Sequence, residues 1–175
     1  MDKRWRNLVI IFIVIIVVVV VYLNMDKIPI FAQDDLSPIA AKYSFSMDSL
    51  AFEGDFSTGD LIKFKAELSN VSSSVEKELV IEKLDYLIDS TEYLDAFFEL
   101  IAGVEENDTP CIYSDSINSL ISDGEQIYQD GQEFNDKVIL EYSDRGYSPI
   151  NELYKIEDSI GILDEYKIML GGLCA

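Results

Sequence analysis

The side chains of this chain that could do chemistry are carboxylates, two cysteines and scattered hydroxyls. Its 175 residues include 33 aspartates and glutamates but no histidine. Without histidine, a serine or cysteine nucleophile would need a lysine or a carboxylate as its base. The sequence has no G-x-S-x-G or Walker-type loop. We therefore expect no catalytic residue, no cofactor and no enzymatic activity.

The two cysteines are Cys111 and Cys174. Two thiolates are too few for a zinc site, and no histidine is present to complete one. In a domain outside the cytoplasm such a pair predicts a disulfide, provided that the compartment is oxidising. A redox-active pair is the alternative, but the sequence has no C-x-x-C motif.

Acidic residues crowd the middle of the chain. Between Lys83 and Lys137 there are fourteen acidic residues and no lysine or arginine. One interpretation is a solvated surface whose repulsion is screened by salt. The alternative is a site for a divalent cation or a basic partner. The candidate metal ligands are Glu105, Glu106 and Asp108, because hard oxygen atoms in a flexible turn suit calcium.

Two triplets match the N-glycosylation sequon, beginning at Asn70 and at Asn107. Both lie in predicted breaks between helices, which suits modification of an outer domain. Pro110 follows the second triplet immediately and weakens it. We treat Asn70 and Asn107 as candidate sites and make no prediction of occupancy.

An unbroken apolar run extends from Leu8 to Leu23. As a helix it would rise about 24 Å, a little less than the hydrocarbon core of a bilayer. Only a helix would satisfy its backbone amides in lipid. The run therefore predicts a transmembrane anchor over residues 8–25. The alternative is a signal peptide cleaved after residues 30–32, where Ile-Phe-Ala makes a poor cleavage site.

Charge predicts how this anchor is oriented. Lys3, Arg4 and Arg6 precede the apolar run, whereas Lys27 alone follows it closely. The positive-inside bias then places residues 1–7 in the cytoplasm as a short tail and the rest of the chain outside the cell membrane. The lipid bilayer is accordingly an expected partner.

After the anchor we expect a linker at residues 26–37 and one extracytoplasmic domain at 38–175. Residues 1–33 hold four basic and two acidic side chains of the 13 and 33 in the chain. The remaining 9 basic and 31 acidic side chains give residues 34–175 a net charge of −22. That charge disfavours nucleic acid and anionic lipid surfaces as partners.

Apolar residues at three- and four-residue spacing predict helices through most of this domain. Proline after Ser37 and after Ser148 predicts two helix starts. The first helix should reach about residue 52, although Tyr43, Phe45 and Met47 alternate as in a strand. The last helix should extend to about residue 170 and end at a pair of glycines.

Between these, periodicity predicts helices at residues 58–103 and 111–143. We expect the first to break at residues 69–74, where Ser73 and Glu76 fit a capping box. A single kinked helix is the alternative. Gly103 should end it.

Short turns between about four helices predict an antiparallel bundle. Two glycines seven residues apart, Gly124 and Gly131, share a face of the third long helix and would permit close packing of a neighbour. The alternative is that they simply weaken this helix, by about 1 kcal/mol each.

These observations predict a mostly α protein, in which one N-terminal transmembrane helix is followed by an acidic helical bundle outside the cell. The expected function is that of a non-enzymatic interaction or accessory protein for another membrane or surface protein. The alternative is a membrane-anchored module that binds a ligand or a divalent cation. An exposed apolar patch would favour the first function. An apolar pocket with convergent polar groups would favour the second.

Overall fold

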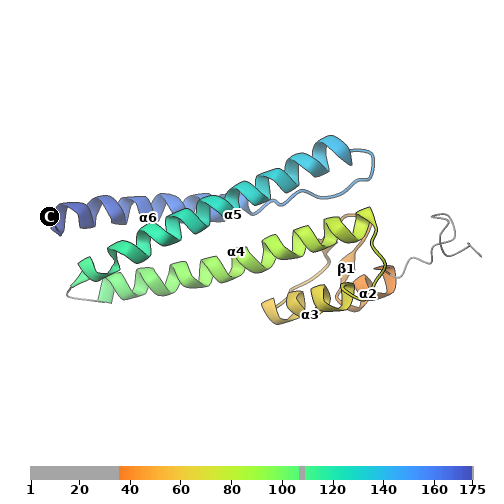
Figure 1. The fold of residues 1–175 in the computed structure, drawn as a ribbon, viewed down its shortest axis with the longest axis horizontal. Helices are drawn as coiled ribbons and strands as arrows, with labels where there is room; N and C mark the ends of the chain where they lie inside the picture. Colours follow the sequence, from red (N-terminus) through yellow and green to blue (C-terminus); the bar gives the residue numbers. More distant parts are fainter. Residues whose placement is uncertain (1–35, 107–108, 175) are drawn as a thin grey trace, which may run out of the picture. The chain divides into compact units, whose positions relative to one another are not determined.

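The computed structural model describes residues 36–106 and 109–174. These residues form five α-helices, one 3-10 helix and a two-stranded antiparallel sheet (Figure 1). In chain order the elements are α2 (Leu36–Lys42), β1 (Phe45–Ser46), β2 (Ala51–Phe52), α3 (Thr58–Leu68), α4 (Val75–Glu106), η2 (Pro110–Tyr113), α5 (Ser114–Glu141) and α6 (Leu153–Leu173). The prediction of a mostly helical bundle is confirmed for this part of the chain.

The three long helices, α4, α5 and α6, run antiparallel to one another in sequence order (Figure 1). Helix α5 packs extensively against both of the others, whereas α4 and α6 meet over a much shorter stretch. The small elements α2, α3 and the hairpin gather against the first half of α4. This arrangement leaves one side of the three-helix layer, between α4 and α6, less completely packed.

Two apolar clusters form the core. The first joins the small elements to α4 and α5 around the fully buried rings of Phe64 and Phe134. The second joins the far halves of the three long helices around Phe97, Ile117 and Leu163. The acidic residues therefore occupy the solvent-facing sides of helices whose opposite sides are apolar.

None of the helices within residues 36–106 and 109–174 has both the length and the apolar character needed to cross a membrane. The cytoplasmic tail and anchor predicted at residues 1–25 lie outside the described residues, as does the linker up to residue 35. The last two linker residues, Leu36 and Ser37, already belong to α2. Ser37 is therefore inside the helix and does not precede it.

The helix predicted to reach residue 52 is wrong beyond Lys42. Ser44 takes a positive φ of 53°, the left-handed conformation that commonly ends helices. The chain then forms the β1–β2 hairpin, in which Phe45 pairs with Phe52. The strand-like alternation at Tyr43, Phe45 and Met47 was thus the better indicator here, because burial of Phe45 against Phe64 rewards an extended backbone.

The break predicted between residues 69 and 74 is confirmed, so the single kinked helix is excluded. The capping box at Ser73 is wrong by one residue. Ser74 is the residue before α4, and its hydroxyl accepts the Lys77 amide at 3.1 Å. The Ser73 hydroxyl donates instead to the Glu78 carboxylate at 3.0 Å.

Glycine and proline were poor guides to the ends of the long helices. Helix α4 continues past Gly103 to Glu106, and α6 continues through both of its C-terminal glycines to Leu173. A glycine inside a helix costs only about 1 kcal/mol, which packing of the same helix readily offsets. Helix α6 also starts at Leu153, four residues after the expected Pro149.

The prediction that Gly124 and Gly131 permit close packing is confirmed. A Cβ at Gly124 would lie 2.6 Å from the hydroxyl oxygen of Tyr93 and 2.9 Å from Ile160 Cγ1. A Cβ at Gly131 would collide with Leu153 and with the Tyr86 ring. These two glycines therefore set how closely α4 and α6 approach α5.

Candidate binding sites

The predicted cation site is not assembled by the described residues. Glu105 and Glu106 lie in the last turn of α4, not in a loop, and Asp108 lies outside the described residues. One Glu105 carboxylate oxygen accepts the Tyr166 hydroxyl at 2.7 Å. Within residues 36–106 and 109–174, no group of three or more acidic, cysteine or histidine side chains could hold a metal ion.

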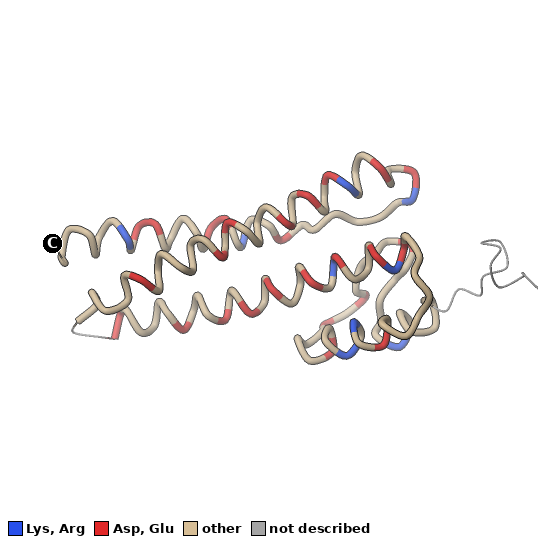
Figure 2. Tube along the Cα trace, viewed as in Figure 1, with Lys and Arg blue, Asp and Glu red and all other residues tan. Residues whose placement is uncertain are grey.

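Carboxylates instead line a groove of about 220 Å³ between α4 and α5. Figure 2 shows acidic residues along the whole length of both helices. Glu82 pairs with Lys137 at 2.6 Å and Asp85 pairs with Lys65, so lysines partly neutralise the groove. Burial and the neighbouring Asp85 carboxylate raise the pKa of Asp89 above its usual range. The groove is thus a partly compensated acidic surface.

A larger pocket, of about 360 Å³, lies between α4, the start of α6, the hairpin and the segment at residues 148–152. Its volume is at the lower end of the range typical of small-molecule sites. The apolar side chains that line it are those of Phe52, Phe56, Leu87, Leu94, Pro149 and Ile156.

Lys83 is the polar side chain that distinguishes this pocket. Only 6% of Lys83 is exposed. Its ammonium group donates to the Ser148 carbonyl at 2.9 Å and lies 5.7 Å from the centre of the Phe134 ring. It forms no ion pair with any carboxylate of the described residues. Burial lowers the pKa of Lys83 to about 8, so the group is still mainly cationic at neutral pH.

The pocket wall at residues 148–152 has no regular secondary structure, but polar contacts fix it on several sides. The Ser148 amide donates to the Ser49 carbonyl at 2.7 Å. The Asn135 side chain makes two hydrogen bonds to the Ile150 backbone, at 2.6 and 3.0 Å. Together with Lys83, these groups hold the connection between α5 and α6 against α4.

The start of α6 also borders the pocket, through Glu152, Lys155 and Ile156. No side chain caps this helix, so its first-turn amides have no side-chain acceptor at the N-cap position. Lys155 pairs with Glu152 at 2.8 Å. The amides of a helix start carry partial positive charge, which adds to the charge of Lys83 on the same pocket.

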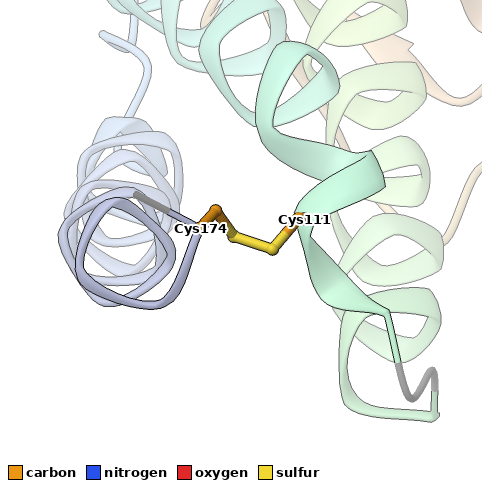
Figure 3. The surroundings of a disulfide bond; sticks show 2 residues. All are labelled: Cys111 and Cys174. Carbon is orange, nitrogen blue, oxygen red and sulfur yellow. A yellow bond between two sulfur atoms is a disulfide. The ribbon is translucent and has the colours of Figure 1, made fainter.

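Cys111 and Cys174 meet at the opposite end of the bundle (Figure 3). The structure joins them in a disulfide with their Cα atoms 5.8 Å apart, linking η2 to the end of α6. Four exposed apolar side chains lie within two helical turns of this bond: Ile112 (65%), Ile168 (76%), Met169 (47%) and Leu173 (66%). We refer to these four residues as the apolar tip.

The two segments that carry the apolar tip contain little charge of their own, although Glu105 of α4 borders them through its hydrogen bond with Tyr166. Residues 109–114 contain no charged side chain, and residues 166–174 contain only Lys167. Figure 2 shows the contrast with the acidic residues along α4 and α5. Of the sequon asparagines, Asn70 is exposed in the turn after α3, and Asn107 lies outside the described residues.

Sequence reasoning missed the Lys83 pocket. In the sequence, Lys83 stands out only as the residue before the acidic stretch. The available signal was its position in the apolar stripe of α4, three residues after Val80 and four before Leu87. A lysine inside such a stripe is rarely buried without a partner.

No protein-family model, no curated protein and no solved structure matches this chain. By its fold and these two features, the protein is a helical bundle with the apolar tip at one end and the Lys83 pocket toward the other.

Proposed function

We propose that this protein is a non-enzymatic interaction protein, anchored by residues 8–25 and presenting its acidic helical domain outside the cell membrane. The anchor and its orientation are supported by the apolar run and by the basic residues before it. The apolar tip is the observation that carries the interaction role. Exposed apolar side chains grouped together commonly mark protein-binding surfaces.

The charge distribution supports the same role. A strongly acidic surface keeps the domain soluble and repels like-charged neighbours. The segments that carry the tip contain no acidic side chain of their own, so a partner would meet less of that repulsion there than along α4 and α5, although Glu105 borders the tip. The disulfide ties η2 to the end of α6 and so restricts the movement of the neighbouring Ile112 and Leu173 backbone. A rigid surface loses less conformational entropy when it binds a partner.

The test is gentle crosslinking in native membranes, extraction in mild detergent and determination of the subunit composition of the particle. We expect a second protein at fixed stoichiometry. Leu173→Glu should reduce its recovery at least fivefold. Leu140→Glu is the matched control, because Leu140 is 78% exposed at the far end of α5. A particle that contains this chain alone, or equal losses in both variants, would contradict the proposal.

A second candidate function is an anchored ligand-binding module. The pocket at Lys83 supports it, because apolar walls and converging polar groups are typical of ligand sites. The test is whether a small amphiphile binds the full-length chain saturably, and whether substitutions in the pocket weaken that binding. The two functions use opposite ends of the bundle, so each can be disabled without affecting the other.

A further inference from the structure

The buried ammonium group of Lys83 has no counter-ion among the described residues. Burying an unpaired charge costs several kcal/mol, and a neutral donor would satisfy the Ser148 carbonyl equally well. A purely structural contact thus leaves the charge of Lys83 unexplained. A negatively charged group in the adjacent pocket would compensate it.

Two other features of the pocket also bear on its preference for a negatively charged ligand. The start of α6 presents amides that no side chain caps. Lys155 stands at the pocket rim, where Glu152 already neutralises it. Lys83 and the helix start therefore leave the pocket with an excess of positive charge.

Most of the other side chains that line the pocket are apolar, with Ser90 and Asn151 as polar exceptions. The rings of Phe52 and Phe56 lie on the hairpin side with their centroids 4.4 Å apart and a tilt of 36° between them. Leu87 and Leu94 lie on the α4 side. A hydrated inorganic anion would gain nothing from these walls. An anion with a hydrocarbon part would bury that part against them, which removes apolar surface from water and favours binding.

The net negative charge of the domain does not prevent such binding. Charges on the solvent-facing sides of α4 and α5 are screened beyond about 8 Å at physiological salt. Inside the pocket, Lys83 is shielded from that solvent and acts at short range.

We propose that the pocket between α4 and α6 binds a small amphiphilic carboxylate. Its head group pairs with Lys83 near the start of α6, and its hydrocarbon part lies against Phe52, Phe56 and Leu87. This inference rests on the second candidate function and names its ligand class. It is independent of the apolar tip.

The test is calorimetric titration of the full-length chain in nanodiscs of zwitterionic lipid, with empty nanodiscs as the blank. The probes are octanoate, octanol and octylammonium, which differ only in the head group. We expect saturable binding of octanoate at one site, and at least tenfold weaker binding of the other two. Octanol binding as tightly as octanoate would overturn the carboxylate inference but leave the ligand-binding function intact. No saturable binding of any probe would overturn both.

Variants locate the site. Lys83→Met should weaken octanoate binding at least tenfold, whereas Lys167→Met, which removes an exposed lysine at the far end of α6, should not change it. Unchanged binding in Lys83→Met would overturn the proposal.

A second pair of variants keeps the test decisive if Lys83→Met folds poorly. Leu87→Glu places a tethered carboxylate one helical turn from Lys83, where it should occupy the ligand's position and abolish binding. Leu87→Gln has the same size without the charge and loses the same apolar contact, so octanoate should bind Leu87→Glu at least tenfold more weakly than Leu87→Gln. Equal binding in the two Leu87 variants would overturn the pairing with Lys83.

Discussion

The side chain of Asn135 hydrogen-bonds both polar groups of the Ile150 backbone. Its Oδ1 accepts the Ile150 amide at 2.6 Å, and its Nδ2 donates to the Ile150 carbonyl at 3.0 Å. A side chain on α5 thus pairs with the irregular segment before α6 as a neighbouring strand would. This contact fixes the wall of the Lys83 pocket, because Ile150 lines that pocket.

Asn135→Ala should lower the free energy of unfolding by about 2 kcal/mol. Each hydrogen bond contributes roughly 1 kcal/mol, and the nearly buried Ile150 backbone would lose both partners. Urea unfolding followed by circular dichroism measures the change. Asn118→Ala is the control, since Asn118 is exposed and bonds only the Ser114 carbonyl of its own helix. Equal effects of the two substitutions would show that the Ile150 contact is not stabilising.

Alanine substitutions at three helical glycines should have opposite effects. Gly124→Ala and Gly131→Ala should each destabilise the fold by about 1–3 kcal/mol, because the new methyl group would collide with packed side chains. Gly161→Ala should stabilise it by about 0.5–1 kcal/mol, because nothing lies within 4 Å of the added Cβ and alanine favours helix. Thermal unfolding of the three variants measures both signs. Stabilisation by Gly124→Ala would contradict the close approach of Tyr93.

Loss of the disulfide should lower stability by about 4 kcal/mol in the chain-entropy model, since the bond closes a loop with a sequence separation of 63. Replacing both cysteines with serine, as a double variant, should have the same effect as reduction of the wild type. Thiol titration of unfolded protein from native membranes provides the direct check. Two free thiols before reduction would show that the bond does not form there.

The titration of Lys83 makes stability depend on pH. Its folded pKa is about 8, against an ordinary value of 10.5. Between these two pH values, the Lys83 side chain is protonated in the unfolded chain but largely deprotonated in the folded chain. The free-energy penalty of burying the cation therefore applies in full below pH 8 and declines as the pH rises. The stability of ligand-free wild type relative to Lys83→Met should therefore increase by up to about 1.4 kcal/mol per pH unit.

Urea unfolding of both proteins at pH 7.5, 8.5 and 9.5 measures this difference. Deprotonation of tyrosines in the unfolded chain lowers stability above about pH 10, and burial raises the folded pKa of Tyr86 to about 12. Wild type and Lys83→Met share this loss of stability, so it cancels when their free energies of unfolding are subtracted. Parallel pH profiles would show that Lys83 is not buried as a cation.

The sequence by itself determined the features that depend on local periodicity and composition. The long apolar stripes predicted α4 and α5, the serine-rich stretch predicted the break before α4, and the spacing of Gly124 and Gly131 predicted a close approach. Each depends on residues within a few helical turns of one another. The acidic charge and the pairing of Cys111 with Cys174 could be inferred from composition alone.

Tertiary structure decided what depends on contacts between distant residues. The hairpin replaces a helix because it buries Phe45 fully and Phe52 partly against Phe64. The start of α6 is delayed to Leu153 because Asn135 and Lys83 bind the backbone of the preceding segment. The Lys83 pocket exists only when the hairpin, α4 and α6 come together, since α4 supplies Lys83 and one apolar wall while the other walls come from the hairpin and α6. Long-range packing outweighs local preferences of about 1 kcal/mol, and those preferences are all that a single sequence displays.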